Sequence, residues 1–457
     1  MESALQNRRM VIVGGGFTGA ACAVQMARLA RGSLEITVVE PRQDLGRGVA
    51  YSTADPDHRL NGPLDNHLLD PAEPDALRRW CEAQGVFARD PDAFANNGTA
   101  YISRGDFGAY VADMVRLEGR SIVHVRARAV DIVPGEAGET VVLEDGSRLP
   151  CALAVLATGN GPTRLPSAFA SLPGDPRIIA DPLAEPVLPE IPPDARVLVI
   201  GASLTALDMA STLVRRGHRG AVNVISRRGL RPRPQRPRGG DADVRALLER
   251  IEGPAPEFVT QALSGGSIRS LLHATRDRIA QLEREGATWH AGFDEVRNSV
   301  WRFWPALSVV EKRRFLRHLR PWYDVHRFRA PPQNEALVRE AEARGLVRFQ
   351  ASRSAPEGRF DAVINCSGLG ADCGARDNTL LAKLLQRGRL KPDPSGFGFA
   401  VDGDCRPLGA DGPQRRLRML GPPTAGTFGD PLGVIFIAPQ VRRACPSMFA
   451  AAGLSPG

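Results

Sequence analysis

Residues 10–40 read MVIVGGGFTGAACAVQMARLARGSLEITVVE, and this stretch decides the fold of the first part of the chain. An apolar run leads into the glycines, a helical pattern follows them, and a second apolar run ends in Glu40. The order strand, GxGxxG, helix, strand, acid is the fingerprint of a Rossmann unit. Gly14 allows the tight turn, Gly16 lets the backbone approach a pyrophosphate, and Gly19 lets the helix pack on its strand. With Glu40 as a ribose acceptor, the stretch predicts a bound dinucleotide.

A second unit of this kind starts near residue 196, where residues 196–206 read RVLVIGASLTA and a helical and a strand pattern follow. Gly201 matches the first fingerprint position, but Ser203 stands where a second glycine is usual. The second strand runs into Arg227 and Arg228 instead of an acid, and cations at this place accommodate a 2′-phosphate. We therefore expect NADPH rather than NADH. Ser203 keeps open the alternative of a degenerate unit that binds no nucleotide.

Between the two units, residues 154–159 read AVLATG, an apolar strand that ends in Thr158 and Gly159. A chain with two Rossmann units and such a strand resembles the flavoproteins with two dinucleotide-binding domains. The resemblance implies FAD in the first unit and NAD(P)H in the second. A similar strand with a Ser-Gly ending, within residues 360–368, would return the chain to the first unit.

The expected fold class is α/β, with two Rossmann-like dinucleotide-binding domains, for FAD and NADPH, and a helical insert. Residues 1–185 and 355–457 would form the FAD-binding domain, and residues 186–354 the NADPH-binding domain. Apolar residues at helical spacing within 243–319 predict an insert that covers a substrate cleft. Its aromatic residues are expected mainly in a core.

Further segments narrow the resemblance. Residues 45–53 read LGRGVAYST, residues 57–61 read DHRLN and residues 104–110 read RGDFGAY. Together they resemble an FAD/NAD(P)-binding family that carries the pattern GRGVAYST…HLLN, over residues 10 to about 440. The resemblance implies that Arg47 contacts the cofactor.

One segment points to a branch of that family. After Asn61 the chain reads GPLDNHLLDP, which is similar to the branch containing flavin-dependent N-monooxygenases that oxidise the amine of aspartate. This likeness implies that His67 and Arg297 hold the substrate carboxylates. A neutral His67 could instead take a proton from an ammonium, and a lone histidine beside Pro and Asp can also be an ordinary loop residue.

Near the C-terminus, residues 429–433 read GDPLG. Asp430 is expected beside a helix start, where a carboxylate can bind the ribityl hydroxyls of a flavin and the helix N-terminus can face its pyrimidine ring. A compatible, simpler interpretation makes Asp430 a helix N-cap. Gly421 is a further candidate at the flavin edge.

Composition excludes several classes of protein. The chain has 457 residues and a net charge of +8, and only three of its 59 basic residues are lysine. Arginine favours anionic ligands, and two nucleotide-binding units explain the charge without a nucleic acid partner. The seven cysteines form no CxxC pair, so a redox dithiol is excluded and no metal site is expected. No apolar run approaches the ~18 residues of a membrane span. We expect a cytoplasmic protein without a membrane partner, and a homo-oligomer stays open.

These observations predict an FAD-dependent, NADPH-consuming monooxygenase. It would N-hydroxylate a small anionic amine substrate such as aspartate with oxygen, through a flavin C4a-hydroperoxide. One alternative is an NAD(P)H:acceptor oxidoreductase that forms no oxygenated product. Another is a non-catalytic FAD-binding sensor.

Overall fold

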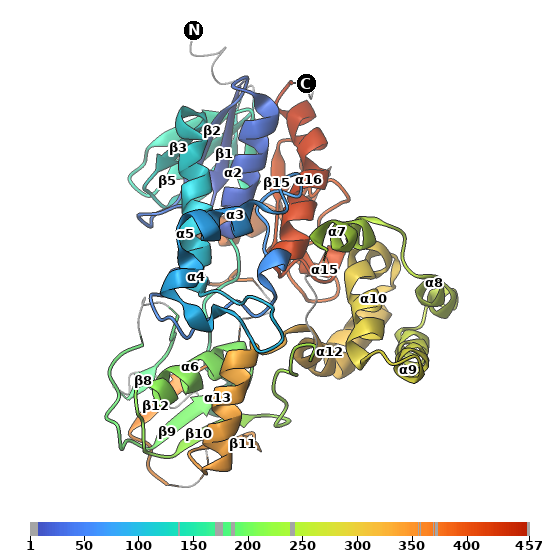
Figure 1. Ribbon diagram of the computed structural model, residues 1–457. Coiled ribbons are helices and arrows are strands. Elements are labelled where there is room, and N and C mark those ends of the chain that lie inside the picture. The colour runs from blue at the N-terminus through green and yellow to red at the C-terminus, as the bar shows by residue number, and fades with distance from the viewer. Residues whose placement is uncertain are drawn as a thin grey trace.

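The computed structural model describes residues 8–135, 138–169, 177–183, 188–237, 243–354, 356, 358–368, 370 and 373–454. The fold is α/β with two parallel Rossmann-like sheets. Figure 1 shows the first sheet beside both termini, the second sheet at the opposite end of the molecule, and a group of helices to one side. No helix in these ranges is long and apolar enough to cross a membrane.

The first sheet has the strand order β15-β7-β1-β2-β3, with all neighbours parallel. Its strands are β1 (Arg9–Val13), β2 (Glu35–Val39), β3 (Ile122–Val125), β7 (Leu153–Leu156) and β15 (Leu417–Met419). The central strands are buried on both faces, which explains why β1 and β7 read as continuous apolar runs. Helix α2 (Phe17–Ala30) joins β1 to β2 and packs on α16 (Val434–Ala451).

The second sheet has the order β11-β10-β9-β12-β8, again parallel. Its strands are β8 (Ile178–Ile179), β9 (Val197–Ile200), β10 (Val222–Ser226), β11 (Val347–Ala351) and β12 (Ala362–Asn365). Helix α6 (Leu204–Arg215) joins β9 to β10 and packs against α13 (Pro332–Ala343). The repeat of strand, glycine turn and helix is therefore present twice, as the sequence predicts.

The strand within residues 360–368 is placed differently from the prediction. It is β12, which pairs with β9 in the second sheet, and β15 returns the chain to the first sheet instead. β8 also belongs to the second sheet, so the limits 185/186 and 354/355 assign both strands to the wrong unit. The error has a local cause. The backbone after β12 packs on the turn of the second unit as the backbone after β7 packs on the first, so the two segments have the same sequence pattern.

Smaller elements surround the first sheet. Three antiparallel strands form one flank, and short helices form another. They are β4 (Ala129–Pro134), β5 (Glu139–Leu143), β6 (Arg148–Cys151), α3 (Ala76–Ala83), α4 (Val86–Arg89), α5 (Arg104–Leu117) and α14 (Thr379–Gln386), with the hairpin of β13 (Leu408–Gly409) and β14 (Gly412–Pro413).

The helical insert lies between β10 and α13. It contains α7 (Val244–Glu252), α8 (Glu257–Leu263), α9 (Ile268–Arg284), α10 (Trp289–Phe303), α11 (Val309–Arg314) and α12 (Arg320–Arg327). Phe303 and Trp304 are buried in a separate apolar core of the insert, whereas Trp322 is 48% exposed. Phe303 and Trp304 are structural, as expected of most aromatic residues in the insert, and Trp322 is an exception.

Buried polar contacts fix the second unit on the first. Arg104 of α5 pairs with Asp208 of α6 at 2.7 Å, and the side chain of Asp208 is buried while that of Arg104 is 11% exposed. Thr212 of α6 donates a hydrogen bond to Asp55 at 2.7 Å and lies 3.2 Å from Nε2 of His58. These contacts hold α6 against the loop after β2 and so determine the geometry of the space between the units.

Candidate functional site

Of the three fingerprint glycines after β1, Gly14 and Gly19 have no space for a side chain and Gly16 has. Gly14 has φ +102°, and a Cβ there would lie 2.4 Å from the carbonyl oxygen of Ala157. A Cβ on Gly19 would lie 1.9 Å from the carbonyl oxygen of Gly14. At Gly16, by contrast, the nearest atom is the Cα of Gly48 at 3.5 Å. Gly14 and Gly19 are thus required by backbone packing, whereas Gly16 leaves space at the start of α2.

That space is suited to an anion. Gly16 is the N-cap of α2, and no side chain from the described part of the protein caps the helix. The first N–H groups and the helix dipole therefore favour a phosphate there. Glu40 is buried at the end of β2 and accepts hydrogen bonds from the backbone N–H groups of Gly15 at 2.9 Å and Arg42 at 3.0 Å. A carboxylate has about four acceptor positions, so a ribose can still bind beside them.

Other candidates gather around the same turn. The backbone N of Thr158 lies beside Gly14, and its buried hydroxyl has no hydrogen-bond partner within the described ranges. Gly159 has φ +67° and open space around it. Gly421 has φ +76°, and a Cβ there would lie 2.6 Å from the hydroxyl of Thr18 in α2. The structure thus brings Thr158, Gly159 and Gly421 to the start of α2.

Arg47 lies in the loop that covers this turn. Its guanidinium is 3.4 Å from Asp44 and donates to the carbonyl of Gly105 at 3.4 Å. The atom that faces Asp44 is the buried Nε, which makes no hydrogen bond among the residues described. Unpaired buried polar atoms are rare in proteins, so the hydroxyl of Thr158 fits a polar ligand bound in this turn.

The second unit repeats the geometry with one change. Gly201 has φ +106°, and a Cβ there would lie 2.0 Å from the carbonyl oxygen of Cys366. Ser203 is the exposed N-cap of α6 with φ −94°, a conformation that serine adopts without strain. Arg227 and Arg228 are exposed directly after β10. The helix start and the two cations fit a phosphorylated nucleotide.

A cleft of about 890 Å³ lies where the first unit, the helical insert and α16 meet. His67 and Arg297, which are far apart in the sequence, both line it. Asp294 and Arg329 also line it, and the sequence did not single out either of them for a function. Arg236, Arg327 and the start of α16, Gly433 and Val434, complete this part of the wall. No short motif marks Asp294 or Arg329, and only the fold brings them to the cleft.

His67 follows a 3-10 turn, Leu64–Asn66, and is buried. Its Nδ1 lies 2.9 Å from the carbonyl oxygen of Pro63, which can only accept, so Nδ1 carries the proton. Burial lowers the pKa of His67 to about 4, while the bond to Pro63 opposes this shift. The imidazole is therefore neutral near pH 7, with Nε2 as a hydrogen-bond acceptor.

Arg297 comes from α10 and shares a carboxylate with other arginines. It lies 3.4 Å from Asp294, which also pairs with Arg329 at 2.6 Å and Arg236 at 3.5 Å. Burial lowers the pKa of Arg297, and its Nε has no hydrogen-bond partner among the described residues. One carboxylate thus faces three guanidinium groups, and the cleft wall keeps a surplus of positive charge.

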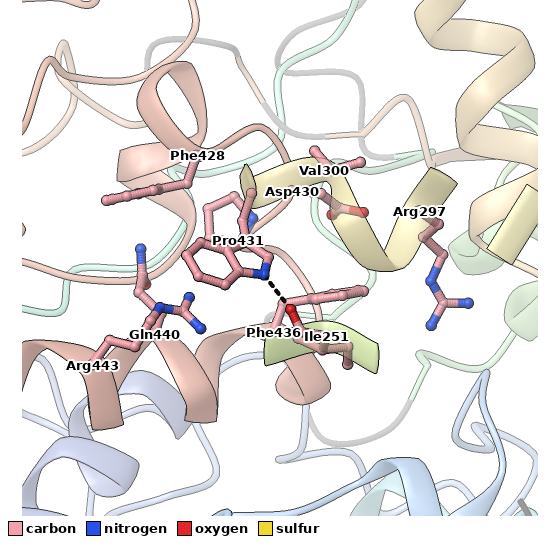
Figure 2. A pocket seen from close by; sticks show the side chains of 10 residues that line it. Ile251, Arg297, Val300, Phe428, Asp430, Pro431, Phe436, Gln440 and Arg443 are labelled. Carbon is pink, nitrogen blue, oxygen red and sulfur yellow. Dashed lines mark hydrogen bonds between the residues drawn. The ribbon is translucent and has the colours of Figure 1, made fainter. Parts of the chain in front are cut away.

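Asp430 lines a second, small pocket of about 10 Å³, and Arg297 lines both this pocket and the cleft. Val300 and Phe436 line this pocket together with Asp430, and Figure 2 shows Arg297 to one side of them. The Oδ2 of Asp430 accepts hydrogen bonds from Nε of Arg327 at 2.7 Å and from the hydroxyl of Tyr323 at 3.0 Å. Its buried Oδ1 has no partner in the described structure. The N-cap of α16 is Gly433, so the N-cap interpretation of Asp430 is wrong.

In the described ranges, no group of three or more His, Cys, Asp or Glu could hold a metal ion. All seven cysteines are buried and free.

Comparisons with known proteins agree with this architecture. Residues 11–161 match the model of a family described as FAD-NAD(P)-binding. No curated protein matches the chain. Among the solved structures that resemble it are three that share 14% identity with it over 97% of this chain. They are the reduced form of ornithine hydroxylase from Pseudomonas aeruginosa (99% of that chain, TM-score 0.59) and Kutzneria sp. 744 ornithine N-hydroxylase with reduced FAD, NADP+ and L-ornithine (98% of that chain, TM-score 0.61). The third is L-lysine 6-monooxygenase from Pseudomonas syringae (99% of that chain, TM-score 0.61). At this identity the likeness shows that the chain has the fold of these flavin monooxygenases.

Proposed function

We propose that this protein is an FAD-dependent, NADPH-consuming monooxygenase that N-hydroxylates a small acidic amino acid, with aspartate as the leading candidate. The observation that carries the proposal is the cleft that His67, Arg297 and the start of α16 line together. The names of the three similar structures, two ornithine hydroxylases and a lysine monooxygenase, support N-oxygenation as the reaction class.

The residues around the first turn fit FAD. The pyrophosphate would bind at Gly16, and Glu40 would hold a ribose hydroxyl. The unpaired polar atoms of Thr158 and Asp430 would gain partners along the rest of the molecule, and Arg47 would contact it from the covering loop. Bound FAD supplies the hydride and oxygen chemistry, and the protein supplies orientation and charge.

NADPH would bind at the second turn. Gly201 and the start of α6 would receive the pyrophosphate, with Ser203 at the N-cap. Arg227 and Arg228 would pair with the 2′-phosphate, since guanidinium groups bind phosphate through charge-assisted hydrogen bonds.

The charge of the cleft favours an acidic substrate. Asp294 can neutralise only one of Arg297, Arg329 and Arg236, so a carboxylate of the substrate would complete the pairing. The unpaired Nε of Arg297 is a donor for that carboxylate. A side-chain ammonium, as in ornithine or lysine, would be repelled by the same groups.

His67 would serve as a neutral hydrogen-bond acceptor rather than as a cation. The lowered pKa of His67 keeps the imidazole neutral near pH 7. Nε2 could therefore accept a hydrogen bond from the amine and orient it, while the hydrogen bond to Pro63 holds the ring in place.

A substrate panel tests the proposal. Aspartate should stimulate NADPH oxidation and oxygen uptake and yield a hydroxylamine, detected by mass spectrometry, whereas ornithine and lysine should not. Arg297→Gln should raise KM for aspartate by roughly ten- to hundredfold, because a hydrogen bond to a charged group is worth about 1.5–3 kcal/mol. Arg302→Gln, an exposed arginine on the same helix, is the matched control and should leave KM unchanged.

Two outcomes would overturn the proposal. Hydrogen peroxide as the sole product with every amine would leave an NAD(P)H oxidase or acceptor reductase. Bound FAD that NADPH does not reduce would leave a non-catalytic sensor.

A further inference from the structure

Arg327, at the end of α12, has a guanidinium in which Nε is hydrogen-bonded and Nη2 is not. Its side chain is 6% exposed, and Nε donates to Asp430 at 2.7 Å. Nη2 is buried and has no hydrogen-bond partner in the described part of the protein. A Cβ on Gly433 would lie 2.7 Å from this Nη2, so the absence of a side chain at Gly433 lets the guanidinium reach the backbone there.

The backbone at Gly433 is the start of a long helix. Gly433 is the N-cap of α16, which has 18 residues, and neither a capping side chain nor an acidic residue in the first turn is present among the residues described. The helix therefore directs free N–H groups and the positive end of its dipole at the point that Arg327 approaches. Two independent features, a buried unpaired donor and an uncapped helix, thus favour an anion at one place. No described residue of the protein supplies it.

The first glycine turn leads to this place. Gly421 packs on Thr18 at the start of α2, and its N–H donates to Gln440 of α16 at 2.8 Å. The segment from Gly421 to Gly433 then runs from the expected pyrophosphate position to the start of α16. A flavin dinucleotide bound at Gly16 would follow this path, and its ring would end near Gly433.

We propose that Arg327, together with the start of α16, contacts the N1–C2=O edge of the flavin and raises the reduction potential of bound FAD. This inference rests on the proposed function only for the identity of the cofactor. Reduction places negative charge on that edge of the ring, and a nearby protein charge tunes the electronics of the flavin. Asp430 orients Arg327 through Nε and offsets part of its charge, and Tyr323 shares the same oxygen.

The test measures the FAD-loaded protein without substrate. One readout is the midpoint potential of bound FAD. The other is the affinity for sulfite, which adds to oxidised flavin and places negative charge on the same edge. Arg327→Gln should weaken sulfite binding about tenfold and lower the potential by about 30 mV, the two-electron equivalent of a tenfold change. Arg327→Lys should recover part of both values. Arg269→Gln, an exposed arginine on α9, is the control and should change neither.

Asp430→Asn provides a second arm if Arg327→Gln takes up no FAD. Removing the offsetting carboxylate should raise the potential and tighten sulfite binding, opposite to the effect of removing the guanidinium. A sulfite affinity within twofold of that of the unmodified protein, or an unchanged midpoint potential, in either FAD-loaded variant would overturn the inference. An unchanged potential with weaker aspartate binding in Arg327→Gln would overturn it as well, in favour of a substrate carboxylate at this site. Because neither readout requires N-hydroxylation, failure of the proposed reaction would be seen separately.

Discussion

Two alanine substitutions in one turn should separate folding from cofactor binding. A Cβ on Gly16 has only the Cα of Gly48 at 3.5 Å, an ordinary contact, and its φ of −69° suits alanine. Gly16→Ala should therefore cost at most about 1 kcal/mol of stability, the usual penalty of alanine at an N-cap. The same methyl group would stand where the pyrophosphate must approach. Losing one charge-assisted hydrogen bond costs about 1.5–3 kcal/mol, so the Kd for FAD should rise roughly ten- to hundredfold.

Gly19→Ala is the matched opposite. Its Cβ would lie 1.9 Å from the carbonyl oxygen of Gly14, so α2 must move away from β1. Overpacking of this kind costs about 1–3 kcal/mol, occasionally more, and the apoprotein should lose that much stability. Urea unfolding of the apoproteins measures the change in stability, and quenching of FAD fluorescence measures the Kd for FAD. A Gly16→Ala protein that binds FAD like the unmodified chain, or a Gly19→Ala protein of unchanged stability, would refute the reasoning.

Three further predictions concern other parts of the structure. Replacing Arg227 and Arg228 together by alanine should raise KM for NADPH at least about tenfold and leave KM for NADH unchanged, as steady-state kinetics would show. His67→Asn should reduce the acid sensitivity of the fold. The pKa of His67 is about 4 in the folded protein and about 6.5 in the unfolded chain, so the unmodified protein loses up to about 3 kcal/mol of stability as the pH falls from 6.5 to 4. Urea titrations at pH 7 and pH 4.5 would measure this loss in both proteins. Asp208→Asn leaves Arg104, which is 11% exposed, without its counter-charge and should cost about 3 kcal/mol in the same unfolding assay, and a loss below about 1 kcal/mol would contradict the pair.

The double Rossmann architecture was predictable because its signals are local. Residues 10–40 contain strand, turn, helix and strand in one continuous stretch, and the backbone contacts of Gly14 and Gly19 explain why glycine is needed at both positions. The pairing of β12 with β9 was not predictable, since strand order depends on contacts between distant segments. An apolar strand with a Ser-Gly ending follows either unit equally well.

The candidate site was predictable only in part. The resemblance placed His67 and Arg297 at a common site, and the structure brings both to the same cleft. Asp294 and Arg329 were missed because arginines and acids are common in this chain and neither belongs to a motif. The roles of Arg47, Asp430 and Ser203 stay predictions, since each depends on a ligand.

The most direct test of the central claim is the origin of the oxygen in the product. NADPH, aspartate and isotopically labelled oxygen gas would be incubated with the FAD-loaded protein, and the amino acid analysed by mass spectrometry. One labelled atom should appear on the nitrogen of aspartate and the other in water, with one NADPH consumed for each hydroxylamine. Unlabelled aspartate, with all the label recovered as hydrogen peroxide or water, would contradict the account.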